Sequence, residues 1–129
     1  MTQRVQVLAV DDDDAIRSLL ASVLREDGYD VVTAPDGAAA LSLLATDWRP
    51  DLILLDVAMP CMDGPAFATL YANGPGPHAP IILLTASSGV DAAEWTEWTG
   101  ASGFLRKPFD LNALEAVVRR HTPACAGTR

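Results

Sequence analysis

Acidic residues that could bind a cation follow two of the apolar runs in this sequence. Asp11–Asp14 come directly after VQVLAV, and Asp56 comes directly after LILL. If Asp11, Asp12 and Asp56 converge, their carboxylates repel one another unless a cation relieves the repulsion. Oxygen ligands of this kind suit a hard ion such as Mg²⁺, and an aspartate carboxylate can also act as a nucleophile toward a phosphoryl group.

Two further side chains could act on such a group. Thr85 follows the apolar run IILL, and Lys107 is the only lysine in a chain with eight arginines. A hydroxyl and an ammonium can stabilise charge on the oxygens of a phosphoryl group during transfer. Lysine suits a site that changes its occupant, because its ammonium is a compact charge on a flexible stem. Taken singly, these residues could equally be caps, strand-end residues or surface charges.

The hydrophobic pattern alternates between strand-like runs and helical spacing. Strands that are apolar on both faces are expected in a parallel sheet with helices on each side. We therefore predict an α/β fold of three layers (αβα), with a doubly wound five-stranded parallel sheet. The predicted strands span 5–10, 30–34, 52–55, 80–85 and 103–106, and the predicted helices span 15–24, 38–46, 66–72, 91–98 and 111–120.

In such folds, ligands bind beyond the carboxyl ends of the strands. The candidate residues follow the first, third, fourth and fifth predicted strands, so their side chains are expected at one edge of the sheet. This arrangement predicts phosphorylation of Asp56 at a site that also holds a divalent cation.

Four segments, in this order, resemble the motifs of response-regulator receiver domains from two-component signalling: VLAVDDDDAIRSLL, LILLDVAMPCMDG, IILLTA and GASGFLRKPF. The resemblance covers residues 4–121 and implies the flavodoxin-like strand order 2-1-3-4-5. Residues 122–129 are then a flexible C-terminal tail. The resemblance also implies that a sensor histidine kinase or a histidine phosphotransfer protein phosphorylates Asp56.

The resemblance implies a set of Mg²⁺ ligands. Asp12 would bind the ion directly and Asp11 largely through water, with Asp56 and the backbone carbonyl of Ala58 completing the protein ligands. One departure lies close by, because Cys61 stands where the family usually has glycine. We interpret it as a small thiol that fills space.

The resemblance also implies a switch. Thr85 would be the switch hydroxyl, and Lys107 would pair with the phosphoryl oxygens, held by a cis bond to Pro108. Phe104 would be the switch aromatic, at a position where many relatives have tyrosine. Since phenylalanine has no hydroxyl to hydrogen-bond, the switch is expected to depend on packing and on movement of Thr85.

Receiver domains commonly use the face of the fourth helix, fifth strand and fifth helix for output or dimerisation. Trp95 and Trp98 lie one turn apart on the predicted fourth helix, and aromatic residues are enriched at interfaces. We predict that a second copy or an effector binds beside them.

Composition narrows the classes of partner. The formal net charge is −8, which argues against direct binding of nucleic acid. No apolar run approaches the length of a membrane span, and two cysteines are too few for a disulfide framework. A cytoplasmic location is expected.

Two other functions fit some of these residues. A Mg²⁺-dependent phosphohydrolase can also use an aspartate nucleophile, but a haloacid-dehalogenase-type enzyme places a second acid two residues later, where this chain has Ala58. A degenerate receiver could act only as a docking module. The presence of Asp12, Asp56, Thr85 and Lys107 together disfavours that alternative.

Overall fold

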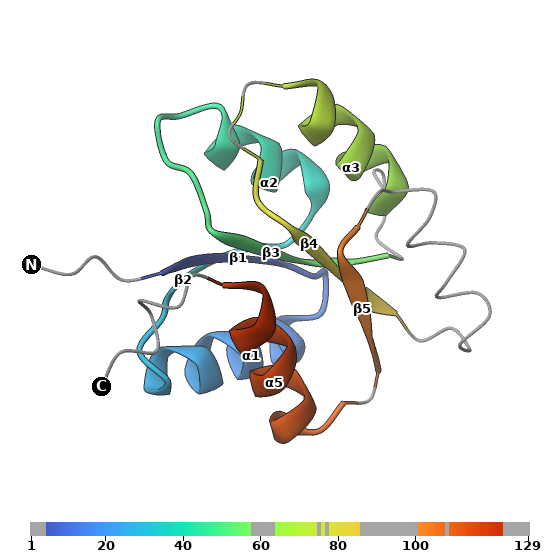
Figure 1. The fold of residues 1–129 in the computed structure, drawn as a ribbon. Coiled ribbons are helices and arrows are strands. Elements are labelled where there is room, and N and C mark those ends of the chain that lie inside the picture. The colour runs from blue at the N-terminus through green and yellow to red at the C-terminus, as the bar shows by residue number, and fades with distance from the viewer. Residues whose placement is uncertain are drawn as a thin grey trace, which may run out of the picture.

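The structure, a computed structural model, describes residues 5–57, 64–74, 76, 78–85, 101–107 and 109–122. It confirms the predicted fold class, a parallel sheet of five strands in the order β2-β1-β3-β4-β5 (Figure 1). The predicted helix 91–98 lies outside the described residues. The described elements are β1 (Gln6–Val10), α1 (Asp14–Glu26), β2 (Asp30–Ala34), α2 (Gly37–Leu44), β3 (Leu52–Asp56), α3 (Gly64–Asn73), β4 (Ile81–Thr85), β5 (Gly103–Arg106) and α5 (Leu111–His121).

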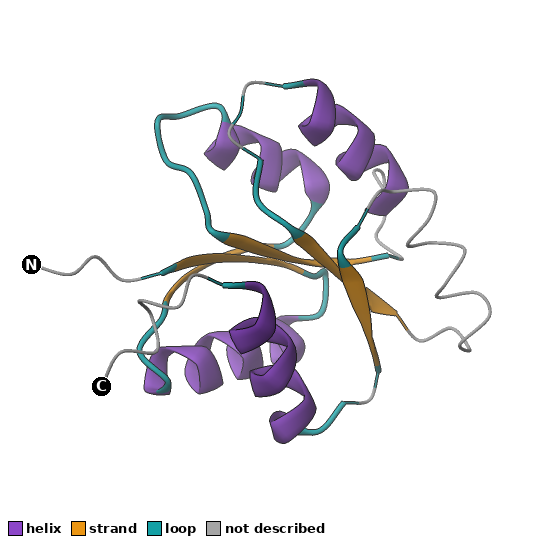
Figure 2. Cartoon of the chain, viewed as in Figure 1, coloured by secondary structure: helices purple, strands orange, loops and turns teal. Residues whose placement is uncertain are grey.

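Helices cover both faces of the sheet, with α1 and α5 on one face and α2 and α3 on the other (Figures 1 and 2). The side chains of β3 divide accordingly. Leu52 and Leu54 belong to the core under α1 and α5, whereas Ile53 and Leu55 belong to the core under α2 and α3. All four are fully buried, which explains why the sequence of this strand lacks polar alternation.

Three helices begin at an aspartate that caps the first turn. Asp13 accepts from the amides of Ala15 and Ile16, Asp36 from that of Ala39 and Asp110 from that of Ala113. Such caps satisfy backbone donors that have no partner inside the helix. One member of the Asp11–Asp14 run is therefore explained by capping alone.

Helix α1 ends at Glu26, and a glycine two residues later turns the chain away from the helix. Gly28 has a φ of 97°, a left-handed conformation that side chains other than glycine rarely adopt. Its amide donates to the Arg25 carbonyl, and the Tyr29 amide donates to the Leu24 carbonyl, which is the Schellman arrangement. This turn directs the chain into β2.

Helix α2 ends two residues earlier than predicted, at Leu44 rather than at residue 46. The Thr46 hydroxyl donates to the Leu43 carbonyl (2.7 Å), and Arg49 Nη1 donates to the Leu44 carbonyl (3.1 Å). These side chains satisfy the last carbonyls in place of a further helical turn.

The amino ends of β1, β2 and β3 are joined by Gln6. Its amide donates to Asp51 Oδ2 (2.8 Å), and its side-chain nitrogen donates to Asp30 Oδ2 (2.9 Å). Its side-chain oxygen accepts from Trp48 Nε1 (3.2 Å). Gln6 therefore supplies a neutral hydrogen-bond donor to each of these two acidic residues.

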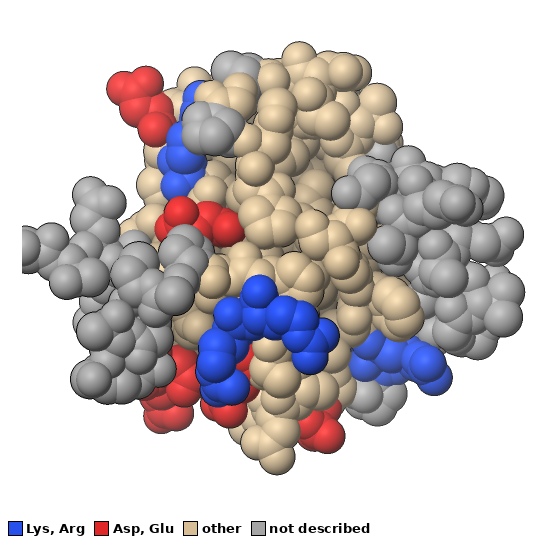
Figure 3. Space-filling model, viewed as in Figure 1, with Lys and Arg blue, Asp and Glu red and all other residues tan. Residues whose placement is uncertain are grey.

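Basic side chains gather over α5 on the face seen in Figure 3. The last turn of this helix carries Arg119, Arg120 and His121, where positive charge complements the helix dipole. In the part of the chain that the structure describes, no helix has the length and apolarity needed to cross a bilayer.

Candidate functional site

The register of the sheet brings the candidate residues to one edge. Asp56 ends β3 and Thr85 ends β4, while Asp11 and Lys107 directly follow β1 and β5. The parallel pairing aligns these ends, since Asp56 is in register with Leu84 of the neighbouring strand. The Lys107 amide donates to the Thr85 carbonyl (2.7 Å), so the two residues are adjacent through their backbones.

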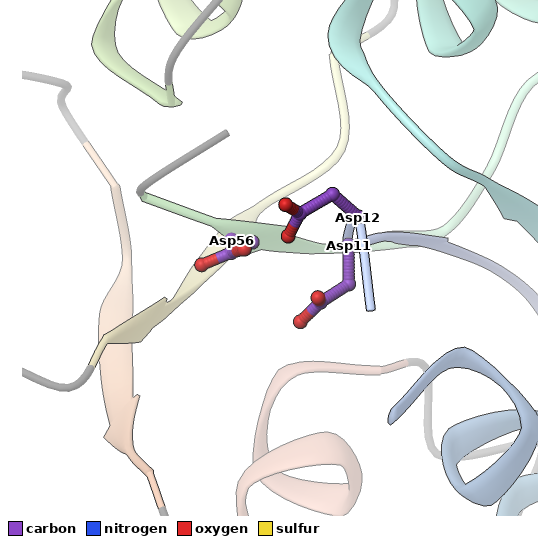
Figure 4. Close-up of side chains that lie close together, drawn as sticks. All are labelled: Asp11, Asp12 and Asp56. Carbon is purple, nitrogen blue, oxygen red and sulfur yellow. The ribbon is translucent and has the colours of Figure 1, made fainter. Parts of the chain in front are cut away.

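Three carboxylates form a cluster at this edge (Figure 4). One carboxylate oxygen each from Asp11, Asp12 and Asp56 lies within 4.8 Å of the other two. Asp11 is fully buried and Asp56 is 5% exposed, whereas Asp12 is exposed to solvent. The cluster therefore has two buried members and one that a ligand from solvent can reach.

The backbone around Asp11 fixes the direction of its carboxylate. The Asp11 amide donates to the Ala34 carbonyl of β2 (3.2 Å), and Asp11 Oδ1 accepts from the Asp13 amide (2.9 Å). The second carboxylate oxygen, Oδ2, is buried and receives no hydrogen bond from the described residues. A buried oxygen of this kind is energetically costly unless a charge compensates it.

Lys107 supplies compensating charge to both buried acids. Its Nζ lies 2.8 Å from Asp11 Oδ2 and 3.4 Å from Asp56 Oδ1. The contact with Asp11 is the shorter of the two. The Lys107 side chain is 22% exposed and is therefore only partly screened by water.

These two carboxylates control the pKa of Lys107. Partial burial alone would lower this pKa, because a low-dielectric environment disfavours the charged ammonium. The contacts with Asp11 and then Asp56 outweigh burial and raise the pKa above its ordinary value. Lys107 is therefore a cation throughout the neutral pH range.

Thr85 and Phe104 lie on the same face of neighbouring strands. Phe104 is in register with Leu83, two residues before Thr85, and side chains two residues apart share a face of a strand. Thr85 is buried, whereas Phe104 is 36% exposed. The two predicted switch residues therefore share a sheet face but differ in their exposure to solvent.

The donor set fits Mg²⁺. The clustered atoms are all carboxylate oxygens, the ligand type that this ion takes in proteins. On the inner side of the cluster, Asp11 Oδ2 is buried and receives no hydrogen bond from the described residues, so a bound cation could compensate its charge. On the outer side, Asp12 is exposed, so an ion can reach the cluster from solvent. Asp11, Asp12 and Asp56 are the residues that could hold the ion.

The family model described as "Response regulator receiver domain" matches residues 7–119. The chain belongs to the response-regulator receiver domains. The chain is 42% identical over 123 residues to response regulator MprA of Mycolicibacterium vanbaalenii and 41% identical to MprA of Mycobacterium tuberculosis. These matches cover 92% of this chain and 52% and 53% of the two relatives. The receiver domain thus spans about half the length of the curated relatives it matches.

Solved receiver structures have the same fold. Chemotaxis protein CheY4 of Vibrio cholerae matches with a TM-score of 0.80 at 34% identity, covering 92% of this chain and 99% of that one. A putative response regulator of Chloroflexus aurantiacus matches with a TM-score of 0.84 at 33% identity, covering 92% and 97%. The predicted family and strand order are confirmed.

The structure brings together Asp11, Asp12, Asp56 and Lys107, and it places Thr85 beside Lys107. Several other predicted residues of the receiver domain lie outside the described residues: Ala58, Cys61, Trp95, Trp98 and Pro108.

Arg17 was not among the residues that the sequence singled out. Its Nη1 donates to the Asp11 carbonyl (2.6 Å), and its Nη2 pairs with the Asp14 carboxylate. The spacing of Asp14 and Arg17, three residues apart in a helix, indicates the ion pair. No sequence pattern indicates the bond to the Asp11 carbonyl.

Proposed function

We propose that this receiver domain is the phosphoacceptor of a two-component or phosphorelay system. A sensor histidine kinase or a histidine phosphotransfer protein donates the phosphoryl group from a phosphohistidine. An Asp56 carboxylate oxygen attacks phosphorus, the phosphorus–nitrogen bond breaks, and an acyl phosphate forms. Water later hydrolyses the acyl phosphate and returns Asp56 to its free carboxylate. The chain acts as a switch and catalyses only its own phosphoryl transfer and dephosphorylation.

One observation carries this proposal: three carboxylates and one lysine meet at the strand ends of a receiver domain. Asp56 is the central acid, since β3 lies between β1 and β4. Lys107 Nζ lies 3.4 Å from Asp56 Oδ1, so its charge would be close to the oxygens of a phosphoryl group attached to this residue. Such preorganised charge is the main contribution of a protein to phosphoryl transfer.

Asp11, Asp12 and Asp56 would hold Mg²⁺, with the Ala58 carbonyl as a further ligand. The ion would neutralise the phosphoryl oxygens during transfer. Asp11 is held in place by the bond between its Oδ1 and the Asp13 amide. Its burial and that of Asp56 exclude water from one side of the site.

The switch is proposed to run from Thr85 to Phe104. The Thr85 hydroxyl would donate to a phosphoryl oxygen, and Lys107 would move its charge from Asp11 toward the same group. Because Phe104 lies on the same strand face as Thr85, this movement would change how its ring packs. The exposed surface of β5 and its neighbours would then differ between the two states.

We propose that the output partner, an effector or a second copy, binds the face formed by the fourth helix, β5 and α5. Phe104 and Leu111 are exposed on the last two elements, 36% and 45% respectively. The net charge of −8 supports a protein rather than a nucleic acid as the direct partner. A cytoplasmic location is part of this proposal, and the presence of only two cysteines supports it.

Intact mass after incubation with acetyl phosphate and Mg²⁺ tests the proposal. The wild-type chain is expected to gain one phosphoryl mass, and omission of Mg²⁺ is expected to prevent the gain. Asp56→Asn is the matched control, because it keeps the shape of the side chain without the nucleophilic carboxylate. Absence of the added mass on the wild type, or equal addition to the variant, would overturn the assignment of Asp56.

A further inference from the structure

The turn between β1 and α1 carries two of the three clustered carboxylates. Within the turn, the Asp13 amide donates to Asp11 Oδ1 (2.9 Å). The Asp11 amide donates to the Ala34 carbonyl of β2 (3.2 Å), which attaches the turn to the neighbouring strand. Asp13 also caps α1. These bonds fix the amide of Asp11 and one of its carboxylate oxygens.

A side chain from α1 fixes the carbonyl of the same residue. Arg17 Nη1 donates to the Asp11 carbonyl at 2.6 Å, a short and charge-assisted hydrogen bond. The other arm of the guanidinium pairs with Asp14, whose side chain is 90% exposed, whereas that of Arg17 is only 18% exposed. The bond to the carbonyl is thus the better shielded of the two contacts.

We propose that Arg17 is a positioning residue for the acidic site. Its bond orients the peptide between Asp11 and Asp12, and this peptide sets the directions in which the buried and the exposed carboxylate point. The inference rests on the proposed function, since Mg²⁺ is the ligand assigned to these carboxylates. Residues that only orient ligands commonly affect metal affinity about 10- to 100-fold.

A purely electrostatic role for Arg17 predicts the opposite change in Mg²⁺ affinity when the residue is replaced. If this residue only offset the charge of the Asp11–Asp14 run, its removal would make the site more negative and Mg²⁺ would bind more tightly. If Arg17 positions the turn, its removal would let the peptide rotate and Mg²⁺ would bind more weakly. The direction of the change therefore separates the two roles.

Arg25 provides a matched control on the same helix. Its Nη2 donates to the Val31 carbonyl at 2.9 Å, and donor and acceptor are six residues apart, as they are for Arg17 and Asp11. Val31 lies near the start of β2, at the edge of the sheet opposite to the acidic site. Arg25→Gln therefore removes the same charge and the same kind of bond without touching the turn.

The test is Mg²⁺ affinity by isothermal titration calorimetry on the whole chain. Arg17→Gln is expected to weaken binding about 10-fold, and Arg25→Gln to leave it unchanged within error. Arg17→Lys keeps the charge without the planar fork and is expected to restore part of the loss. Thermal unfolding of each variant establishes that the folded protein is being compared.

Amide hydrogen exchange of the Mg²⁺-free protein gives a second readout. Protection of the Asp13 amide is expected to fall in Arg17→Gln and to stay constant in Arg25→Gln, because only the first variant frees the turn.

Wild-type or tighter Mg²⁺ affinity in Arg17→Gln, or an equal loss in Arg25→Gln, overturns the positioning role. If the wild type binds no Mg²⁺, the proposed metal site fails, and exchange of the Asp13 amide decides the role of Arg17 by itself. Equal protection in both variants then overturns it.

Discussion

At the amino ends of the strands, Asp30 and Asp51 each accept a hydrogen bond from Gln6, whereas at the carboxyl ends Asp11 and Asp56 face one lysine. The two edges belong to the same sheet and both carry acidic residues. At the amino edge, N–H groups of Gln6 donate to one carboxylate oxygen of each acid. At the carboxyl edge, Asp11 Oδ1 accepts from the Asp13 amide, whereas Asp11 Oδ2 and Asp56 Oδ1 face the Lys107 ammonium.

This difference indicates that acidic residues alone do not identify a cation site. The discriminating features are burial and mutual proximity, together with Asp11 Oδ2, a buried oxygen that has no hydrogen-bond partner among the described residues. The two edges should therefore respond differently to Mg²⁺, to loss of their cationic or amide partner, and to pH.

Replacement of an acid at each edge should give the largest contrast. Asp12→Asn is expected to weaken Mg²⁺ binding by more than about 100-fold, since loss of a ligand exceeds the cost of misorienting one. Asp30→Asn is expected to leave the affinity unchanged, because asparagine can still accept from Gln6 Nε2. Calorimetric titration of both variants checks this. Similar losses in the two would remove the distinction between the edges.

Removal of the residue that contacts the acids at each edge should lower the free energy of unfolding by different amounts. Lys107→Met removes the ammonium that faces the Asp11 and Asp56 carboxylates, and we expect a loss of about 2–3 kcal/mol because Lys107 is partly exposed. Gln6→Ala deletes the partly buried side-chain hydrogen bonds with Asp30 and Trp48 and should cost about 1 kcal/mol.

Urea unfolding with and without Mg²⁺ measures both losses. Added Mg²⁺ should recover stability in Lys107→Met, since a bound cation replaces the missing ammonium and binding favours the folded state. Gln6→Ala should show no recovery beyond that of the wild type. Recovery in neither variant would argue that the buried charge at the carboxyl edge is neutralised in another way.

The fold and the location of the site follow from the sequence because their signals are local. Strands that are apolar on both faces specify a covered parallel sheet, and this topology places Asp56 and Lys107 at one edge. The boundaries of the described helices differ from the predictions by at most two residues. At Leu44 the helix ends early because side chains of the following loop decide where the last carbonyls find donors.

The burial of each acid and its hydrogen-bond partners depend on the direction in which the side chains point in the folded chain. Asp11 and Asp12 are the same residue type in adjacent positions, yet one is fully buried and the other is exposed. The bond from Arg17 to a backbone carbonyl has no signature in residue type, since every residue carries that acceptor. Neither property can be derived from spacing alone.

The pH dependence of stability should report on the Lys107 ion pairs. The pKa of Lys107 is raised in the folded state, so its contribution is fully present below the unfolded value of about 10.4 and is lost as pH rises through the folded value. The difference in unfolding free energy between wild type and Lys107→Met should be constant from about pH 7 to pH 10 and shrink above that range. If the difference in unfolding free energy already declines near neutral pH, the ion pairs of Lys107 do not determine it.

A third pair of acids, outside both edges, sharpens the comparison. Glu115 of α5 lies at the surface beside Asp27, at the end of α1, and the charge of Asp27 and a hydrogen bond with it raise the pKa of Glu115. Arg119 acts in the opposite direction but does not cancel this effect. The pair is close, yet it lacks the burial of Asp11 and Asp56, so we expect Mg²⁺ affinity to be unchanged in Glu115→Gln.

The expected effect of Glu115→Gln on stability is small and depends on pH. Because the pKa of Glu115 is raised on folding, its ionisation disfavours the folded state as pH rises from the unfolded value, about 4.3, through the folded value. Glu115→Gln should therefore raise the melting temperature slightly at pH 7 and leave it unchanged near pH 4. Asp27→Asn should give the same pattern, since it removes the other member of the pair. A Mg²⁺ affinity that falls in either variant would mean that proximity of carboxylates, rather than their burial, determines where this chain binds the ion.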